Sequence, residues 1–446
     1  METLVVVGGV AAGLSAASAA KRLKKKELHA VVFERSGYIS YGACSEPYFV
    51  AGLVPEPDDL VEITPEEFAR KREIPTHRMH EVLDADYESG QVTVLDLADG
   101  RRFNEHFDYL MLATGSVGRR LDVPGEELAG VHALRTVEDA IAVRDSARAA
   151  DDVAICGGGY IGLEMAEAFV AMGKRVVILK KTDQMLLNFD PEVSRLVEDE
   201  VRAKGVDVRT GVDVLALEGR GRVEKVVTSE GDVKAESVLV AKGGVPNTTL
   251  ARHLGVDLGA TGAIAVDRRQ KTNLDRVYAG GDCAEAYHIV SGRPAYIPLG
   301  TTANKTGRVA GQNIGGLRTE FPGIVGTAVS KIFDLQVART GLSLKEATDI
   351  GLEARSSTIQ QGSRSSHYPG GSPITVHLVT EAGTRRLLGA QMVGREGVAH
   401  RIDVLATALH AAMTAEDIYH LDLAYAPPYA PVWDPILIAA NKARKA

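Results

Sequence analysis

The chain has 446 residues, with 51 Lys or Arg and 59 Asp or Glu for a formal net charge of −8, and it is 45% hydrophobic and 25% charged. This composition is typical of a globular protein of roughly two to four domains, and it excludes a collagen-like fibre, a disulfide scaffold and a mostly disordered chain. The mild acidity and the lack of a long basic stripe argue against nucleic acid as the main partner.

Apolar runs such as residues 4–7 and 238–241 are strand-sized, so no membrane-spanning segment is expected. The N-terminus enters a hydrophobic run without the basic segment and cleavage site of a signal peptide, and we therefore expect a cytoplasmic protein. In that compartment Cys44, Cys156 and Cys283 are expected to be reduced. They lack the spacing of a zinc site or a C-x-x-C motif, so no metal site is expected.

The first predicted unit begins at residues 4–13, where an apolar run leads into a glycine turn and a small-residue helix. Its turn holds Gly8, Gly9 and Gly13. A second apolar run, residues 30–33, ends at Glu34, 21 residues after Gly13, where a carboxylate can accept the hydroxyls of an adenosine ribose. Because Val10 replaces the central glycine of the G-x-G-x-x-G motif, approach to a pyrophosphate would depend on Gly8, Gly9 and the helix N-terminus.

Cys44 follows this unit, in a segment rich in Ser, Gly and Tyr. Pro47 suits the first turn of a helix, so we expect the Cys44 sulfur near a helix N-terminus, where the pKa of a thiol is lowered. A thiolate there would be a nucleophile. The alternative is a small buried hydrophobe, which Cys156 and Cys283 fit. No second cysteine lies nearby, so any redox chemistry would pass through a mixed disulfide, persulfide or sulfenic acid of one thiol.

Residues 153–162 repeat the pattern of the first unit and carry the full glycine motif, with Gly157, Gly159 and Gly162. The next apolar run ends at Lys180, followed by Lys181, where a ribose-binding acid would stand in an NADH site. A lysine can pair with a 2′-phosphate, which favours NADPH over NADH. The alternative is that both lysines only point into solvent.

Two apolar runs, residues 109–115 and 277–283, resemble returning strands that end in small residues near a cofactor. Because the second run follows the second unit, the second nucleotide domain is expected to be inserted into the first. After about residue 325, alternating runs at residues 374–379 and 387–393 predict antiparallel strands, and a helix is expected at residues 398–412.

Taken together, several segments resemble the single-cysteine branch of the pyridine nucleotide-disulfide oxidoreductases, and within it the coenzyme A disulfide reductases. They are residues 8–13, 40–48, 157–162, 281–282, 297–305 and 425–429. The resemblance covers essentially the whole chain. It implies an α/β fold with two Rossmann-like nucleotide-binding domains, the NAD(P)H domain being inserted in the FAD domain, plus an α+β C-terminal dimerisation domain. The expected boundaries are residues 1–117 and 245–325 for the FAD domain, 118–244 for the NAD(P)H domain and 326–446 for the dimerisation domain.

The resemblance also implies a role for individual residues. FAD would be held by Gly8, Gly9, Ala12, Gly13, Glu34, Arg35, Ala113, Thr114, Gly115, Gly281 and Asp282. NADPH, or NADH, would be held by Gly157, Gly159, Tyr160, Ile161, Gly162, Glu164 and Lys180. Coenzyme A would contact Arg22, Ser40, Arg72 and Asn304. Cys44 would be the redox nucleophile, and in a homodimer Tyr368 and Tyr425 of the neighbouring subunit would face its sulfur.

The implied activity is reduction of coenzyme A disulfide to two thiols through FAD and a mixed disulfide at Cys44, with Tyr425 or Tyr368 protonating the leaving thiolate. Four alternatives remain: an NAD(P)H oxidase or peroxidase, a persulfide or polysulfide reductase, an electron-transfer flavoprotein with a protein partner, and a redox sensor. The family usually has Gly where Ser45 stands, which leaves the fine geometry of the substrate pocket open. The chain ends at Ala446, without the rhodanese-like domain of some persulfide-reducing relatives, so a dedicated persulfide role is less expected.

Overall fold

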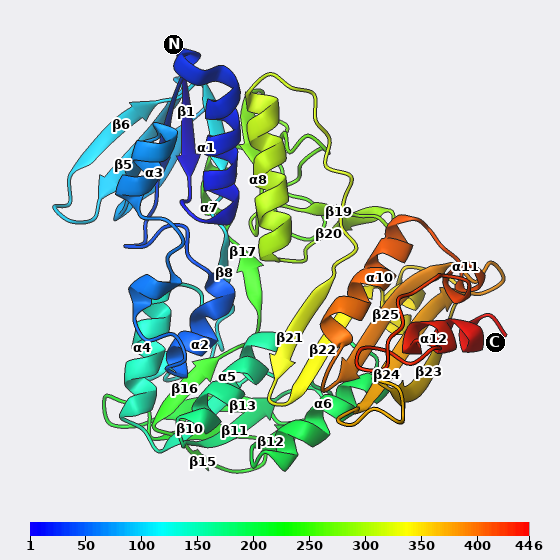
Figure 1. Ribbon diagram of the computed structural model, residues 1–446. Coiled ribbons are helices and arrows are strands. Elements are labelled where there is room, and N and C mark those ends of the chain that lie inside the picture. The colour runs from blue at the N-terminus through cyan, green and yellow to red at the C-terminus, as the bar shows by residue number, and fades with distance from the viewer. Residues whose placement is uncertain (446) are drawn as a thin grey trace.

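The computed structural model describes residues 1–445, which form three units, each built on its own sheet (Figure 1). The first unit is a five-stranded parallel sheet in the order β18-β7-β1-β2-β3. Its strands are β1 (Glu2–Val7), β2 (Leu28–Phe33), β3 (Thr76–His77), β7 (Tyr109–Leu112) and β18 (Val277–Ala279). Both predicted returning runs therefore join the sheet of the first glycine turn, as expected for strands that are apolar on both faces.

Helices α1 (Ala11–Lys24) and α8 (Gly300–Ile314) pack side by side on this sheet (Figure 1). Their close approach depends on two glycines of α8. A Cβ atom on Gly307 would lie 2.1 Å from the carbonyl oxygen of Ala12, and one on Gly311 would lie 2.1 Å from that of Ala16. The small residues of the two helices thus set the distance between them.

The second unit is also a five-stranded parallel sheet, in the order β12-β11-β10-β16-β9. Its elements are β9 (Val131–His132), α4 (Val137–Arg148), β10 (Asp152–Cys156), α5 (Tyr160–Ala171), β11 (Arg175–Lys180), α6 (Pro191–Ala203), β12 (Asp207–Thr210) and β16 (Ser237–Val240). All of them fall in sequence between β7 and β18, so the second unit is inserted into the first. The chain crosses between the two units as an antiparallel pair, β8 (Ser116–Gly118) and β17 (Gly244–Pro246).

The third unit is an antiparallel sheet in the order β21-β22-β25-β24-β23, accompanied by helices. Its elements are β21 (Ala328–Ile332), β22 (Leu335–Gly341), α9 (Leu344–Asp349), β23 (Ala354–Gly362), β24 (Pro373–Glu381), β25 (Leu387–Gly394), α10 (Val398–His410), α11 (Ala415–Tyr419) and α12 (Pro435–Ala443). The antiparallel strands are confirmed, and the predicted helix at residues 398–412 is α10, which ends two residues earlier. The observed architecture confirms the expected fold class, while the domain boundaries stay a prediction.

Shorter elements complete the described chain. They are η1 (Lys25–Glu27), η2 (Ala43–Ser45), α2 (Glu46–Val50), η3 (Pro57–Leu60), α3 (Pro65–Arg72), β4 (His80–Asp86), β5 (Gln91–Asp96), β6 (Arg102–His106), β13 (Val214–Glu218), β14 (Lys225–Thr228), β15 (Val233–Lys234), α7 (Thr249–His253), β19 (Ala286–His288) and β20 (Arg293–Ala295). None of the helices within residues 1–445 combines the length and the apolar character needed to span a bilayer.

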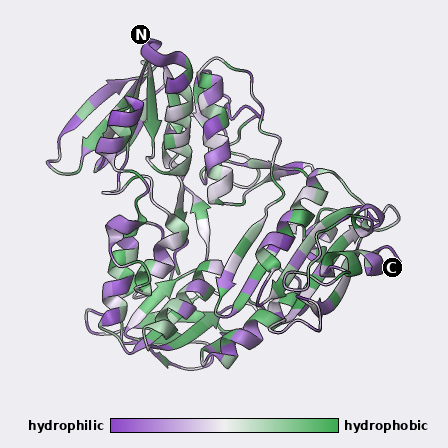
Figure 2. Ribbon diagram, viewed as in Figure 1, coloured by the Kyte–Doolittle hydropathy of each residue, from purple (hydrophilic) through white to green (hydrophobic). Residues whose placement is uncertain are grey.

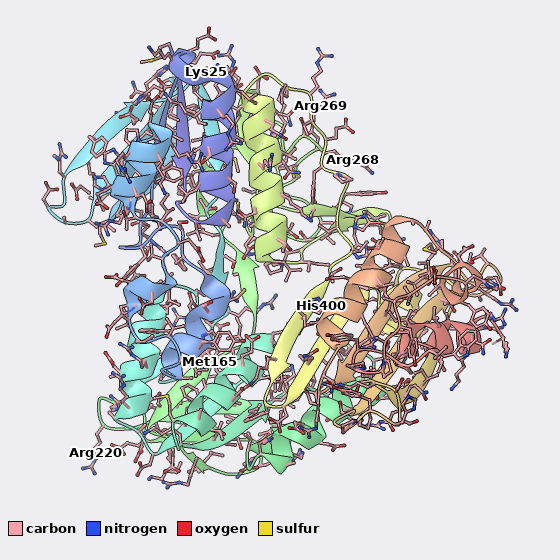
Figure 3. All side chains as sticks on the ribbon, in the orientation of Figure 1. Lys25, Met165, Arg220, Arg268, Arg269 and His400 are labelled. Carbon is pink, nitrogen blue, oxygen red and sulfur yellow. The ribbon has the colours of Figure 1, made fainter. Side chains whose placement is uncertain are left out.

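One hydrophobic core joins parts of all three units. The buried side chains around α4, β10 and α5 also include Phe49 of α2 and Phe333 of the turn between β21 and β22. Figure 2 shows the apolar residues gathered along the strands, and in Figure 3 Met165 lies inside while Lys25 and Arg220 lie at the periphery. Helix α2 and the C-terminal sheet are thereby packed against the second unit.

Candidate active site

A single cavity of about 2140 Å³ extends through the region where the three units meet. It is lined by both glycine turns, by η2 and α2, by the ends of β7, β11 and β18, by the start of α8 and by β21. Ligand sites in parallel α/β sheets lie at the carboxyl ends of the strands, and the cavity has this position relative to β1, β10 and β11. Its size suits two large ligands rather than one small metabolite.

The first glycine turn is shaped by close backbone contacts. Gly8 has a φ of 110°, and a Cβ atom there would lie 2.1 Å from the carbonyl oxygen of Ala113. A Cβ atom on Gly13 would lie 1.9 Å from the oxygen of Gly8. These glycines let β1 turn directly into α1, whose N-terminus has no side-chain cap at Val10 and faces the cavity. An uncapped helix N-terminus of this kind offers backbone N–H groups to a phosphate.

Glu34, at the end of β2, is fixed by the backbone on both sides. Its Oε2 accepts a hydrogen bond from Gly9 N at 2.6 Å and its Oε1 accepts one from Ser36 N at 2.8 Å. Burial raises the pKa of this carboxyl, and the two hydrogen bonds oppose that shift. Each oxygen keeps a lone pair for a further donor, as a ribose hydroxyl would require.

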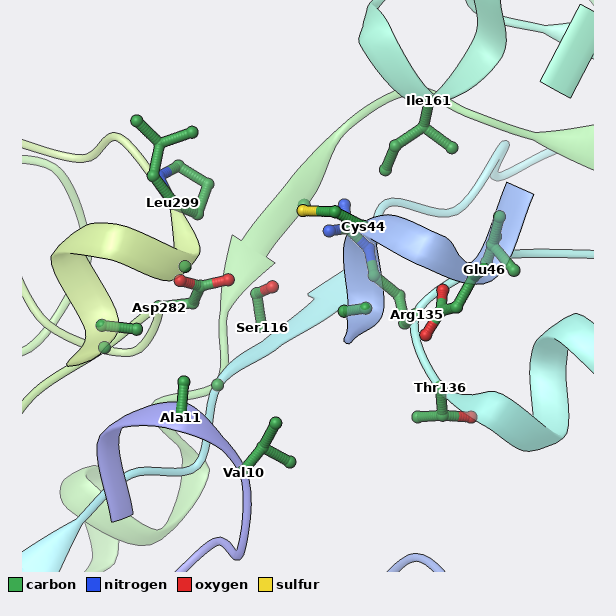
Figure 4. A pocket seen from close by; sticks show the side chains of 18 of the residues that line it. Val10, Ala11, Cys44, Glu46, Ser116, Arg135, Thr136, Ile161, Asp282 and Leu299 are labelled. Carbon is green, nitrogen blue, oxygen red and sulfur yellow. The ribbon is translucent and has the colours of Figure 1, made fainter. Parts of the chain in front are cut away.

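Asp282 lies at the other wall of the cavity, after Gly281, which has a φ of 77°. Burial raises the pKa of Asp282, while the charge of Arg135 and a hydrogen bond from Ser116 lower it. Figure 4 shows Asp282 and Ser116 facing the same open space as Cys44. The Asp282 carboxylate is therefore stabilised by Ser116 of β8 and by Arg135, which precedes α4.

The second glycine turn differs from the first in its central position. Gly157 has a φ of 134°, and Cβ atoms on Gly157 and Gly162 would lie 2.2 Å from carbonyl oxygens. A Cβ atom on Gly159 would meet nothing within 4 Å, so Gly159 faces open space at the start of α5. The first and third glycines serve the packing of the chain, and the central one leaves room for a pyrophosphate.

Beside this turn, Tyr160 and Lys180 line the cavity. Burial raises the pKa of Tyr160 to about 12, so its phenol stays protonated at neutral pH. Burial lowers the pKa of Lys180, which has no ion-pair partner within the described chain. Lys181 is exposed and pairs with Asp213 at 2.9 Å. Both lysines line the cavity, but they are not equivalent, because Lys181 is paired with Asp213 and Lys180 has no ion-pair partner among residues 1–445.

Cys44 is the one exposed cysteine of the three, and its side chain projects into the cavity (Figure 4). Pro47 lies in the first turn of α2, as predicted. The expected lowering of the thiol pKa is wrong for the protein alone, because burial and the charges of Glu164, Glu46 and Asp282 raise the pKa of Cys44. Helix α2 has five residues, and the field at the N-terminus of so short a helix does not outweigh burial together with three carboxyl groups.

The remaining predicted residues fall into three groups. Those that line the cavity with Cys44 include Ala12, Arg22, Arg35, Ser40, Arg72, Ala113, Thr114, Gly115, Ile161, Glu164 and Asn304. The residues that line the cavity do not include three of the predicted glycines, Gly9, Gly13 and Gly162. Tyr368 and Tyr425 lie outside the cavity of their own chain, with 39% and 46% of their surface exposed. The roles predicted for all of these residues stay predictions.

Three residues near the site were missed by the sequence analysis: Glu46, Arg135 and Ser330. Glu46 stands directly before Pro47, in a segment that the sequence analysis singled out. Its burial, with 3% of its surface exposed, comes from packing against α4, which the local sequence does not indicate. Arg135 and Ser330 come from distant parts of the chain and have no motif of their own. No local signal could have assigned them.

Comparison with known proteins agrees with this geometry. Residues 2–307 match the model of the pyridine nucleotide-disulphide oxidoreductase family, and residues 327–435 match that of its dimerisation domain. The chain is 43% identical over 443 residues to a Pyrococcus abyssi protein named NAD(P)H sulfur oxidoreductase (CoA-dependent), covering 99% of this chain and 98% of that one. It is 29% identical over 448 residues to a coenzyme A disulfide reductase of Staphylococcus aureus, covering 100% of both chains. The structure of an NAD-dependent persulfide reductase from A. fulgidus has a TM-score of 0.96 at 37% identity, covering 99% of this chain and 83% of that one.

These matches confirm the family resemblance, the oxidoreductase class and the pair of cofactors expected from the sequence, FAD and a nicotinamide nucleotide. The two glycine turns, with Glu34 and Asp282 beside the first and the open position at Gly159 in the second, fit two such dinucleotides. The chain belongs to the FAD-dependent pyridine nucleotide-disulphide oxidoreductase family.

Proposed function

We propose that the protein uses NAD(P)H to cleave the sulfur–sulfur bond of a coenzyme A disulfide or coenzyme A persulfide at Cys44. The observation that carries this proposal is the exposed sulfur of Cys44 in the same cavity as both glycine turns, while Cys156 and Cys283 are buried. Sulfur–sulfur exchange needs one accessible thiol, and the described chain offers one.

Coenzyme A as the carrier is supported by the basic groups of the cavity. Its phosphates need cationic side chains, and such residues line the cavity from α1, α3 and α8. They are Arg22, Arg72, Lys305 and Arg308. The names of the relatives, a CoA-dependent sulfur oxidoreductase and a coenzyme A disulfide reductase, also support this substrate class.

Bound FAD supplies two-electron transfer between NAD(P)H and sulfur. The chain's own chemistry begins when Cys44 loses its proton and its thiolate attacks the sulfur–sulfur bond of the substrate. A new bond forms between Cys44 and the sulfur of coenzyme A, and the other sulfur leaves as a thiolate or hydrosulfide that takes up a proton. Two electrons from NAD(P)H then break the mixed disulfide, which restores the Cys44 thiolate and releases coenzyme A as a thiolate that takes up a proton, so each NAD(P)H and one proton yield two reduced sulfur species.

The test is anaerobic NAD(P)H consumption by the FAD-loaded protein with coenzyme A disulfide or coenzyme A persulfide, in which released thiol and sulfide are counted. Cys44→Ser should abolish product release, whereas Cys156→Ala, which removes a buried thiol, should not. Two thiols for each NAD(P)H identify the disulfide as substrate, and one thiol with one sulfide identifies the persulfide. Consumption that occurs only after air is admitted would overturn the proposal in favour of an oxidase.

For the nicotinamide nucleotide, we infer that NADPH is preferred through Lys180. The ammonium group of Lys180 is half-buried and has no carboxylate partner, so it is poorly solvated in the free protein. A 2′-phosphate would give it a charge-assisted hydrogen bond, which stabilises the complex with NADPH. Lys180→Ala should lower the ratio of kcat/KM for NADPH over NADH about tenfold or more. Lys181→Ala, which removes a lysine already paired with Asp213, is the matched control and should change the ratio far less. Equal effects of the two substitutions would contradict the assignment to Lys180.

A further inference from the structure

Ser330 brings the C-terminal sheet into contact with the nicotinamide side of the cavity. It lies in the middle of β21, is 5% exposed, and its Oγ donates a hydrogen bond to Glu164 Oε1 at 2.6 Å. Glu164 is on α5, one turn after the start of the helix, and lines the cavity with Tyr160 and Ile161. The hydroxyl and the carboxylate thus come from two different units of the same chain.

A second contact fixes the same two elements. Glu167, three residues after Glu164 and on the same face of α5, pairs with Lys331 and accepts a hydrogen bond from Phe333 N at 2.7 Å. Ile332 and Phe333 are buried in the core that contains α5. Figure 1 shows β21 running beside α5. These contacts hold β21 against α5, so the position of Ser330 relative to Glu164 is set by the fold.

The electrostatic surroundings of Glu164 give this hydrogen bond its importance. Burial raises the pKa of Glu164, the negative charge of Glu167 adds to that rise, and the Ser330 hydroxyl opposes it. The titratable and charged groups that face Glu164 come from α5, β21, α2 and η2. They are Glu167, Tyr160, Lys331, Tyr48 and Cys44. Lys331 forms an ion pair with Glu167. Within residues 1–445, Ser330 is the one side chain shown to donate a hydrogen bond to Glu164.

We propose that Ser330 is a positioning residue of the nicotinamide site, which holds Glu164 ionised and turned toward the cavity so that it accepts the amide N–H of a nicotinamide nucleotide. The amide of nicotinamide is a neutral donor, and its hydrogen bond to a carboxylate is stronger than one to a protonated carboxyl. The inference rests on the use of NAD(P)H in the proposed function and is independent of the identity of the sulfur substrate. The C-terminal sheet thereby takes part in nucleotide binding within one subunit.

The test is the pH dependence of NADP⁺ binding to the FAD-loaded protein, measured by calorimetry in buffers of different ionisation enthalpy, so that protons taken up or released on binding are counted. In Ser330→Ala, the loss of NADP⁺ affinity on acidification should begin about one pH unit higher than in the wild type, because a donor to the charged form is lost. Proton release on binding should be centred at a higher pH in Ser330→Ala than in the wild type, since the loss of the donor raises the pKa of Glu164 in the free protein and binding of the amide favours its ionised form. Ser330→Thr, which keeps the hydroxyl, should restore the wild-type profile.

Ser357→Ala is the matched control. Ser357 is also a buried serine of the C-terminal sheet, and its Oγ has no hydrogen-bond partner among the described residues, so its loss should leave the profile unchanged. In a Glu164→Gln background, Ser330→Ala should have no further effect on the pH profile. Should the alanine variant not fold, Ser330→Cys, a weak donor of similar size, takes its place.

An unshifted profile in a folded Ser330→Ala or Ser330→Cys variant would overturn the inference. So would a shift of the same size in the Glu164→Gln background, because Ser330 would then act through another group. The binding measurement uses no sulfur substrate. Failure of the protein to reduce coenzyme A disulfide or persulfide would therefore refute the proposed function and leave this result unaffected.

Discussion

Glu46 lies two residues from Cys44 and is almost completely buried. It is 3% exposed, and its Oε1 has no hydrogen-bond partner in the described part of the chain. Burial raises the pKa of Glu46 to about 8, Asp139 and Glu138 raise it as well, and Arg135 opposes them. In Figure 4 the carboxyl of Glu46 lies on the side of Arg135, while the sulfur of Cys44 points the other way. At neutral pH this side chain is therefore mainly a neutral acid.

This raised pKa makes Glu46 a source of pH-dependent stability. Between its unfolded value of 4.5 and about 8, the folded state binds more protons than the unfolded state, so its contribution to stability falls as the pH rises. Glu46→Gln is neutral at every pH and should remove that fall. Its stability relative to the wild type, both FAD-loaded, should be more favourable at pH 8 than at pH 5 by on the order of a few kcal/mol. The measurement is the midpoint of thermal unfolding at the two pH values. Glu127→Gln, at an exposed position, is the control, and a parallel response of both variants would contradict the prediction.

The residues of the site divide by whether their role depends on local sequence. Gly8, Gly157 and Cys44 could be predicted, because a turn between strand and helix and a lone cysteine among polar residues are visible in a short window. The direction of the pKa shift of Cys44 could not, since burial within the folded cavity is its main cause and Glu164 and Asp282, which are distant in sequence, add to it. Sequence distance is thus the physical limit on predicting the electrostatics of this cavity.

At the scale of elements, the start of α6 is joined to the C-terminal sheet by a buried polar network around Asp190. Asp190 accepts hydrogen bonds from Gln391 Nε2 at 2.7 Å and from Leu344 N at 3.1 Å, and it lies 3.0 Å from His377 Nε2. Asp190 and Gln391 are nearly fully buried, and His377 is fully buried. The hydrogen bonds and His377 hold the pKa of Asp190 below its usual value despite burial.

Removing this acceptor leaves several buried donors without a partner. Asp190→Ala should lower the free energy of unfolding of the C-terminal unit by about 3 kcal/mol or more. Because the folded pKa of Asp190 is below the unfolded one, its contribution is fully present at neutral pH and is lost as the pH falls below about 4. Limited proteolysis and thermal unfolding at pH 7 measure the effect. Asp199→Ala, on the exposed face of the same helix, is the control. A C-terminal unit as stable in Asp190→Ala as in the control would refute a supporting role.

The helices and strands could be predicted from the periodicity of the sequence more readily than the contacts between them. The parallel strands were visible as short apolar runs beside glycines, and the order of these runs predicted the inserted unit. Nothing in residues 328–332 indicates that β21 packs on α5, because alternation of apolar and polar residues fixes the buried face and not the partner. The contact between Ser330 and Glu164 needed the three-dimensional structure.

At the scale of the whole molecule, the relatives bear on the choice between a disulfide and a persulfide substrate. The sulfur oxidoreductase of Pyrococcus abyssi is matched over 98% of its own length. A relative named for sulfur reduction thus corresponds to this chain from end to end. The proposed function therefore includes both a disulfide and a persulfide of coenzyme A as substrates.

Assembly is the other property of the whole molecule that bears on the reaction. Residues 327–435 match a dimerisation domain, and Tyr425 lies exposed outside its own cavity. If a homodimer places Tyr425 opposite the partner's sulfur, each site combines Cys44 of one subunit with Tyr425 of the other. A phenol beside that sulfur can donate a proton to the leaving thiolate.

Hybrid dimers, purified through two different affinity tags, distinguish sites shared between subunits from sites within one subunit. A hybrid of a Cys44→Ser subunit with a Tyr425→Ala subunit should have about half the wild-type activity, because one of its two sites is intact. A hybrid of a wild-type subunit with a subunit carrying both substitutions should be strongly impaired, since each of its sites lacks one partner. The reverse order of the two activities would show that Tyr425 acts on the sulfur of its own subunit. Both hybrids contain the same substitutions, so a difference between them reports only which subunit supplies each side chain.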